Sequence, residues 1–279
     1  MLTLYRDVSF KISRLVTRSY STSFSIAVRF LKPELQRAIY SIYGFVRLAD
    51  EIVDTFHDFD KESLLANFER DFYDALKHGI SLNPVLNSFQ ETVRIYKIDD
   101  KLIQAFLTSM KTDLVKNDHC SKDETDDYIY GSAEAVGLMC LKVYTEGDQA
   151  LFDELKQPAK KLGAAFQKVN FLRDLKNDME LLNRRYFHGI VEKDFDEEIK
   201  NEIINDIDND FSFSFTGLKK LPQNSKLGVL IAYCYFRSLL KKIKRTPAQK
   251  LLEKRIRISG FQKFILFIRA YIACKLKLV

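Results

Sequence analysis

Two pairs of aspartates in this sequence have a spacing that could hold a divalent cation. Asp50 and Asp54 lie four residues apart, and so do Asp174 and Asp178. Residues i and i+4 of an α-helix lie on the same face, so each pair would present its carboxylates in one direction. Asn170 lies four residues before Asp174. We call Asp50 and Asp54 the first row, and Asn170, Asp174 and Asp178 the second row.

Like charges on neighbouring turns repel each other, so each row requires an explanation. The repulsion costs about 0.2–0.5 kcal/mol per pair, which a solvated helix face tolerates. The sequence around the rows is apolar, however, and Leu172 and Leu175 flank Asp174. If the two helices face each other, the carboxylates converge inside the protein, where they cannot stay ionised without compensating charge.

A divalent cation with oxygen ligands would compensate the two rows. Mg²⁺ is commonly held by a few carboxylates together with substrate phosphates. Arg47, Arg173 and Lys176 lie within one helical turn of the rows and could bind those phosphates. Metal ions and cationic side chains can accelerate the departure of a diphosphate by stabilising its developing negative charge. The alternative for Arg47 is an ordinary surface ion pair with Asp50, worth a few tenths of a kcal/mol.

Apolar residues at helical spacing place both rows on long helices. One helix is predicted over residues 34–55, with Pro33 in its first turn, and another over residues 158–182. The same periodicity predicts helices over residues 8–18, 61–78, 84–96, 100–112, 125–146, 227–243 and 251–277. Strand-like alternation is scarce and the chain has only 10 Gly and 5 Pro, so we predict an all-α fold.

Two stretches are predicted to lie at least partly outside regular helices. Residues 113–127 are polar and are interpreted as part loop. Residues 192–223 are the least regular, and their acidic run at 206–210 is interpreted as a solvated loop, because it lacks the glycine and glutamate of a calcium-binding loop. No repeat or linker marks a boundary, so residues 1–279 are predicted to form one domain.

Charge and composition narrow the classes of partner. The formal charge is +6, and residues 241–279 carry twelve Lys or Arg but one acid, Glu253. Such a segment suits a solvated face or an anionic membrane surface, and no nucleic-acid motif accompanies it. The four cysteines lack metal-ligand spacing and are predicted to be reduced.

Membrane-spanning and secretory signals are not found in the sequence. No apolar run approaches the roughly 20 residues that cross a bilayer, and residues 1–10 do not resemble a signal peptide. We expect a cytoplasmic protein, with peripheral contact between the basic C-terminal helix and the inner membrane face as an open alternative.

Four segments together resemble the phytoene/squalene synthase family of head-to-head prenyltransferases. They are STSF at 21–24, YGFVRLADEIVD at 43–54, YG and VG at 130–131 and 136–137, and QKVNFLRDLKND at 167–178. Their order and spacing run through most of the chain, which looks most like a bacterial phytoene synthase. The resemblance implies a single-domain, all-α terpenoid-synthase bundle around a central cavity.

The resemblance also implies a role for each matching residue. The residues implied to bind two or three substrate-bridged Mg²⁺ ions are Asp50, Asp54, Asn170, Asp174 and Asp178. Those implied to contact substrate, mostly at its diphosphate, are Ser21, Ser23, Tyr43, Arg47, Gln167, Asn170, Arg173, Arg185, Tyr186 and Tyr235, with Arg255 or Arg257 as a further phosphate ligand. Tyr130 is implied to lie beside the reacting carbons. The family often has His where this chain has Tyr20.

The implied reaction joins two prenyl diphosphates through a cyclopropylcarbinyl diphosphate. We favour phytoene from two geranylgeranyl diphosphates, as in carotenoid biosynthesis, over a C30 squalene or dehydrosqualene made from farnesyl diphosphate. No glycine-rich nucleotide fingerprint is present, and a C-terminal membrane anchor of the eukaryotic squalene synthase kind is not seen, which favours phytoene over squalene. NADPH is not expected for phytoene. Small residues such as Ala133 and Ala164 are candidates for the cavity floor that sets product length.

Two other classes of protein fit the sequence less well. A di-metal oxidase bundle needs an acid-x-x-His motif on two helices, and here Asp54 and His57 form one pair while the second row has no His. A helical protein that binds prenyl lipids without catalysis would not need the full set of aspartates.

Overall fold

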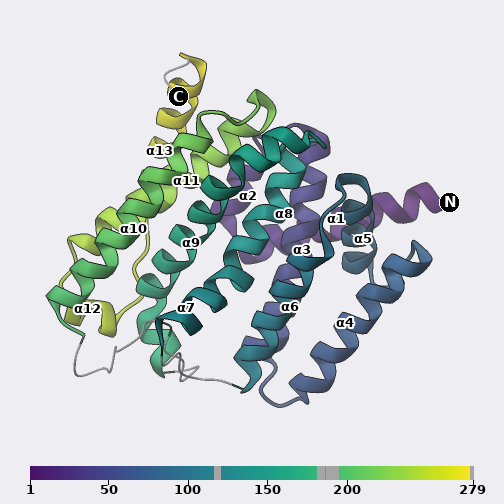
Figure 1. Ribbon diagram of the computed structural model, residues 1–279, viewed down its shortest axis with the longest axis horizontal. Coiled ribbons are helices and arrows are strands. Elements are labelled where there is room, and N and C mark those ends of the chain that lie inside the picture. Colours follow the sequence, from purple (N-terminus) through teal and green to yellow (C-terminus); the bar gives the residue numbers. More distant parts are fainter. Residues whose placement is uncertain (116–120, 181–185, 187–194, 277–279) are drawn as a thin grey trace.

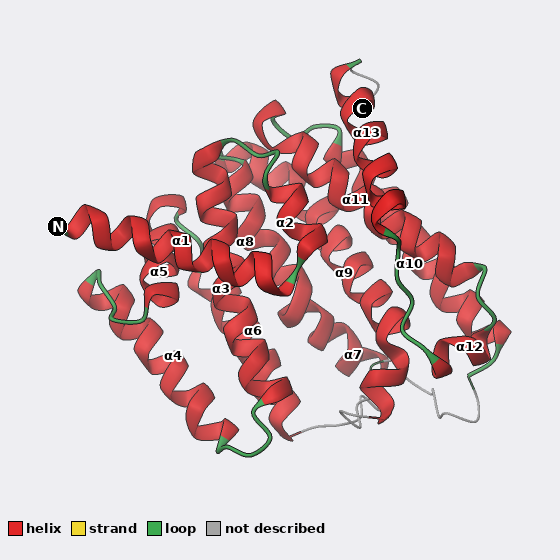
Figure 2. Cartoon of the chain, turned by 180° about the vertical axis from the view of Figure 1, so that it is seen from behind, coloured by secondary structure: helices red, strands yellow, loops and turns green. Residues whose placement is uncertain are grey.

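Every regular element in the described part of the chain is a helix (Figures 1 and 2). The computed structural model of the protein describes residues 1–115, 121–180, 186 and 195–276. The elements are α1 (Leu2–Tyr20), α2 (Thr22–Val28), α3 (Pro33–Thr55), α4 (Lys61–His78), α5 (Pro84–Tyr96), α6 (Asp100–Val115), α7 (Lys122–Ile129), the π-helix η1 (Tyr130–Glu134), α8 (Ala135–Tyr144), α9 (Gln149–Glu180), α10 (Glu197–Leu218), α11 (Gln223–Lys244), α12 (Ala248–Glu253) and α13 (Gly260–Lys275). The predicted all-α fold is confirmed.

Local signals fix the ends of several helices. Asp60 caps α4 by accepting a hydrogen bond from the Ser63 backbone, and Gly79 ends that helix at a φ of 74°, which glycine adopts without strain. Asn83 and Pro84 begin α5. The bounds of α4 and α5 agree with those predicted from the sequence, because their caps and their apolar periodicity point to the same residues.

The helices that carry the two rows lie in different parts of the bundle. The first row is on α3 and the second row is on α9, and α8 packs against both helices (Figure 1). Helices α10 and α11 also pack on α9, whereas α1 and α5 pack on α3. This arrangement leaves space between α3 and α9.

An aromatic cluster anchors α3 on the side away from α9. Phe45 is fully buried and its ring lies 4.0 Å from that of Phe89, with Phe68 and Phe72 also in contact. Replacing such a phenylalanine with alanine typically costs about 3–5 kcal/mol of stability. The cluster therefore holds the helix of the first row firmly against α4 and α5.

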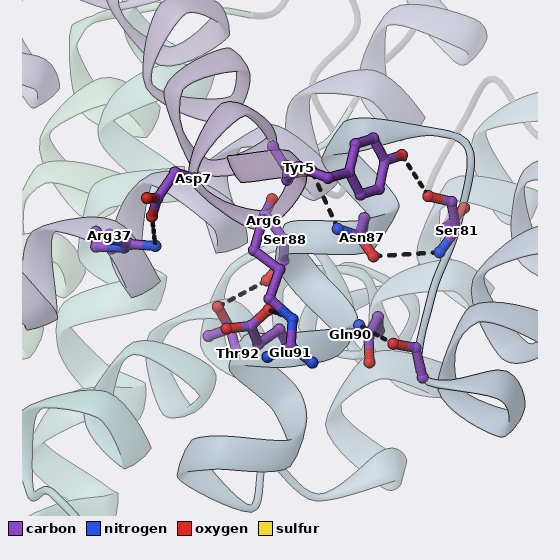
Figure 3. A network of polar contacts seen from close by, with 12 residues as sticks. Tyr5, Arg6, Asp7, Arg37, Ser81, Asn87, Ser88, Gln90, Glu91 and Thr92 are labelled. Carbon is purple, nitrogen blue, oxygen red and sulfur yellow. Dashed lines mark hydrogen bonds and ion pairs between the residues drawn. The ribbon is translucent and has the colours of Figure 1, made fainter. Parts of the chain in front are cut away.

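Small polar residues join α1 to its neighbours. Ser13 and Ser88 share a hydrogen bond of 2.7 Å, and Asn87 donates to Ser9 at 3.0 Å. Figure 3 shows this interface, in which Tyr5 also donates to the Ser81 carbonyl. Side chains this small allow α1, α3 and α5 to approach closely while their buried polar groups stay satisfied.

The prediction for the acidic run at 206–210 is wrong, because this run lies within helix α10. Asp206 and Asp210 are one turn apart and face α9, where Lys168 binds both of them and Lys161 binds Asp210 at 2.9 Å. Burial alone would lower the pKa of Lys168, but the two carboxylates outweigh it and raise this pKa. The charges are thus ion-paired across a helix interface.

Other predicted boundaries also differ from the structure. The helix predicted over residues 251–277 is interrupted, since α12 ends at Glu253 and α13 begins at Gly260. Helix α9 begins at Gln149, so Pro158 lies inside it and packs against Gly217 of α10, where a side chain would collide with the proline ring. Asp113 lies in the last turn of α6, and α7 begins at Lys122. Tertiary packing extends α6 and α9 beyond what local pattern indicates.

Candidate active site

A cavity of about 1010 Å³ lies between α3 and α9. Its walls come mainly from α2, α3, α8, α9 and α11. Small-molecule sites typically measure about 300–1,000 Å³, so this cavity is at the large end of that range. One part of it is lined by the charged rows and the other by apolar side chains.

Both residues of the first row line the cavity, and Arg47 accompanies them. The Arg47 guanidinium donates to Asp50 and to Glu51, which lie one turn along the same helix. It also lies over the ring of Tyr20, 4.4 Å from the ring centre. Burial would lower the pKa of Arg47, but the two carboxylates raise it overall. Arg47 is therefore a fixed cation at the cavity wall.

Hydroxyl groups from α2 and α3 lie beside the first row. Ser21, Ser23 and Tyr43 all line the cavity, and the Tyr43 ring stacks on Phe24 at 5.1 Å. Burial raises the pKa of Tyr43, although Arg47 and a hydrogen bond with Ser21 oppose this shift. The phenol therefore stays protonated and can donate a hydrogen bond to an anion.

The second row lines the cavity from α9, and Asp174 is bound by two arginines. Arg173 donates through Nε at 3.1 Å, and Arg255 contacts the same carboxylate at 2.6 Å. The backbone N–H of Ile256 donates to the Arg173 carbonyl at 3.3 Å. These contacts hold the segment that follows α12 across the second row.

The oxygen donors of the two rows suit a magnesium ion that is shared with phosphate. Asn170 Oδ1 is buried and has no hydrogen-bond partner among the described residues, so its lone pairs are available to a ligand. Within the described ranges, no three acidic, His or Cys side chains are close enough to hold a metal by themselves. Mg²⁺ is usually held by one or two carboxylates, with substrate phosphate and water as its other ligands.

Most of the other predicted residues are also brought to the cavity. Gln167, Tyr186 and Tyr235 line it, as do Arg255 and Arg257. Arg185 lies outside the described residues.

The structure does not bring Tyr130 to this cavity. Tyr130 is 37% exposed and lines a separate hollow of about 410 Å³ together with Thr108 and Asp127. Lys160 lies 5.0 Å from the centre of its ring. Residues two positions apart on a helix point about 200° apart, so Tyr130 faces away from the wall that Tyr128 joins.

Tyr128 lines the cavity where Tyr130 does not. Its hydroxyl donates to Asp113 at 2.7 Å, and burial raises its pKa well above the usual value. Its ring stacks on Tyr186 at 5.0 Å, which in turn stacks on Phe171 at 4.2 Å. The three rings form an aromatic wall beside the second row.

Helical spacing in the sequence could have identified Tyr128, which the family motifs did not include. The cavity-lining residues of this region are 128, 132, 133, 136, 137, 140, 141 and 144. They repeat at helical spacing in a single stripe, and the stripe includes Tyr128 and excludes Tyr130. Ala133 belongs to this stripe, whereas Ala164 packs behind the wall with Tyr128 and Phe171.

Apolar residues line the part of the cavity away from the rows. They include Val28, Leu31, Leu141, Leu155, Leu218 and Val229. A chain of hydrocarbon could lie there out of contact with water.

Comparisons with known proteins show which family this sequence resembles. A family model described as squalene/phytoene synthase matches residues 17–262. The chain is 24% identical over 273 residues to the 4,4'-diapophytoene synthase of Staphylococcus haemolyticus, covering 89% of this chain and 91% of that protein. It is 27% identical over 275 residues to a chloroplastic phytoene synthase of an Oncidium hybrid cultivar, covering 92% of this chain and 66% of that protein.

Solved structures show the same fold. A crystal structure of a dehydrosqualene synthase in complex with ligand superimposes with a TM-score of 0.85 at 21% identity, covering 97% of this chain and 98% of the other. A squalene synthase from Alicyclobacillus acidocaldarius gives a TM-score of 0.76 at 20% identity, covering 87% and 95% of the two chains.

Proposed function

The chain belongs to the squalene/phytoene synthase family, and we propose that it joins two prenyl diphosphates head to head in a magnesium-dependent reaction. The observation that carries this proposal is the position of both acidic rows, each with its arginine, on the walls of one cavity whose remainder is apolar. A diphosphate matches the charged part and an isoprenoid tail matches the apolar part.

The residues of the two rows would bind the diphosphates. Arg47, Arg173 and Arg255 offer guanidinium groups, which bind phosphate oxygens in bidentate geometry. Asp50, Asp54, Asn170, Asp174 and Asp178 would hold Mg²⁺, which would withdraw charge from the leaving diphosphate when bound. Because these groups are already in place, little reorganisation is needed as charge develops.

The first ionisation breaks the C–O bond of one donor, and the diphosphate leaves with the bonding electrons. The double bond of the second donor attacks the allylic cation, and loss of a proton from C1 of that second donor closes the ring of a cyclopropylcarbinyl diphosphate. A second ionisation, rearrangement and loss of a proton then give the linear hydrocarbon. The protein's tasks are to align the donors, to stabilise the departing anion and to exclude water that would trap the cations.

The aromatic wall could stabilise the carbocations that form after each ionisation. Tyr128, Tyr186 and Phe171 present ring faces or edges at the cavity beside the second row. Aromatic faces attract cations by about 0.5–2 kcal/mol, more strongly when water is excluded. We assign to Tyr128 the position beside the reacting carbons that the sequence suggested for Tyr130, since Tyr128 reaches the cavity.

Two donor lengths are candidates. Similarity to several phytoene synthases, including that of Arthrospira platensis at 27% identity over 184 residues, favours geranylgeranyl diphosphate and a C40 product. Similarity to a 4,4'-diapophytoene synthase over 91% of that protein's length favours farnesyl diphosphate and a C30 product. Chain length is decided by how far the apolar part of the cavity extends, and Ala133 is a lining residue at which it can be shortened.

The test is incubation of the purified protein with each radiolabelled donor and Mg²⁺, followed by mass analysis of the extracted hydrocarbon. We expect one donor to give a C40 or C30 hydrocarbon, and none to form with EDTA. Parallel reactions with NADPH distinguish squalene from dehydrosqualene if the product is C30. Tight binding of both donors without any hydrocarbon would overturn the proposal and support a prenyl-lipid carrier.

A further inference from the structure

Helix α13 lies at the edge of the molecule (Figures 1 and 2). Its exposed side carries a row of large apolar residues. Phe261 is 74% exposed and Phe264 is 59% exposed. The other large apolar residues that the helix and its end leave exposed are Ile265, Ile268, Tyr271, Ile272 and Leu276. Single exposed apolar residues are common on proteins, but a contiguous set on one helix marks an interaction surface.

This face is not the one that packs on the protein. Ala270 is buried, and Phe267 stacks on Phe30 with 4.6 Å between ring centres. The helix packs against α11 through this inner side. At 100° per residue, Ile268 lies about 160° around the helix from the buried Ala270, and Phe264 about 120°. A helix that is apolar on both sides is normally buried on both sides. We therefore expect a partner to cover the outer face.

The charge of the region identifies the partner. Residues 254–279 contain seven Lys or Arg and no acidic residue. Of these, Arg269 and Lys275 are exposed on α13, next to the apolar face. A second copy of the chain docked on this face would bring these cations together without compensating acids. A surface of anionic lipid offers both an apolar interior and negative charge.

We propose that the outer face of α13 docks on an anionic membrane surface. Its aromatic and aliphatic side chains enter the boundary between headgroups and acyl chains, and Arg269 and Lys275 extend to the phosphates. No helix among the described residues is long and apolar enough to cross a bilayer, so this contact is peripheral. The proposal goes beyond catalysis and does not depend on it.

The docking helix also forms part of the cavity wall. Lys263 is on the inner side of α13, lines the cavity and lies 5.5 Å from the ring centre of Tyr235. Ile258, just before the helix, lines the cavity too. Docking of α13 would therefore place one wall of the cavity close to the lipid.

The test is co-sedimentation of the whole protein with phosphatidylcholine vesicles that contain or lack phosphatidylglycerol. We expect binding to the anionic vesicles that weakens as salt rises. The double variant Phe264→Glu/Ile268→Glu should bind at least about tenfold more weakly, because it removes two apolar side chains that would enter the lipid and adds repulsion. Arg269→Gln with Lys275→Gln should weaken binding to the anionic vesicles by about fivefold or more.

A matched control separates this effect from a general change in hydrophobicity. Ile95→Glu alters a residue of α5 that is 60% exposed and far from α13 in the fold, and it should leave vesicle binding unchanged. Circular dichroism should show the same helicity in all variants, since none of these side chains is buried. Failure of the wild type to bind anionic vesicles, or equal binding by the α13 variants, would overturn the proposal. So would a dimer in light scattering that Phe264→Glu dissociates, because a second copy would then cover the face.

Discussion

The two acidic rows differ in where their countercharge comes from. Arg47 belongs to the same helix as the first row and reaches Asp50 within one turn. The second row receives Arg173 from its own helix and Arg255 from 81 residues further along the chain. Among the contacts between described residues, the first row is paired with an arginine of its own helix, whereas the second row is also paired with an arginine from a distant segment.

Similar sequence motifs can therefore be supported by different parts of the fold. The helix of the first row is held by the buried Phe45 cluster on its outer side. The second row is crossed by the segment before α13, which bonds to it through the Ile256 backbone and the Arg255 side chain. Substitutions in the segment before α13 should therefore disturb the second row more than the first.

The largest expected effect is the loss of turnover when either row loses a carboxylate. Asp50→Ala and Asp174→Ala should each lower kcat by at least about 10²–10³-fold, the typical cost of removing one group that stabilises developing charge. Circular dichroism and thermal unfolding should remain close to wild type, because both side chains face the cavity. Asp126→Ala, at an exposed position of α7, is the control and should keep full activity. Wild-type turnover in either row variant would refute the assignment.

The next effect distinguishes the two sources of countercharge. Arg47→Gln removes the guanidinium that binds Asp50 and Glu51, and should lower kcat/KM by about 10²-fold. Arg255→Gln leaves Arg173 on Asp174 and should lower it by about tenfold. Steady-state kinetics with the preferred donor measures both values. An equal or larger loss in Arg255→Gln would show that the second row depends more on its distant arginine than the contacts suggest.

The aromatic wall beside the second row provides a third test. Tyr128→Phe removes a hydroxyl that bonds to the buried Asp113 and should reduce kcat by about tenfold or more, with a modest loss of stability. Tyr130→Phe is the matched control, two residues away and outside the cavity, and should change kcat less than twofold. The reverse result would place Tyr130, and not Tyr128, beside the reacting carbons.

The smallest effect concerns the α8 wall that lies between the two rows. Burial raises the pKa of the Cys140 thiol to about 12 from its ordinary value of 9.0. Because the folded state holds this proton more tightly, its contribution to stability is complete below pH 9 and is lost as pH rises toward 12. Between pH 9 and 10 this should reduce the free energy of unfolding by about 1 kcal/mol.

Chemical denaturation across this pH range measures that loss. Cys140→Ala should make the curve less steep between pH 9 and 10, where Cys234, whose thiol pKa is also raised by burial, still contributes, and the buried tyrosines, whose pKa values are raised too, still lower stability above pH 10. A curve in the variant that is identical to wild type would show that the thiol does not titrate in this way.

Much of the helical architecture could be predicted from the sequence, because caps and apolar periodicity act locally. The bounds of α4 and α5 are examples. The run at 206–210 was misjudged because its aspartates gain helix-stabilising partners, Lys161 and Lys168, from another helix. A window of sequence cannot show such partners.

The sequence alone shows two rows of oxygen-bearing side chains at i, i+4 spacing, each beside an arginine, on helices with apolar flanks. These are properties of neighbouring residues, so they are visible in the chain. Only the tertiary structure decided that both rows line one cavity, that Arg255 completes the second, and that Tyr128 and not Tyr130 lies at the wall. Those facts depend on the rotation and packing of helices far apart in sequence, which the local pattern leaves free.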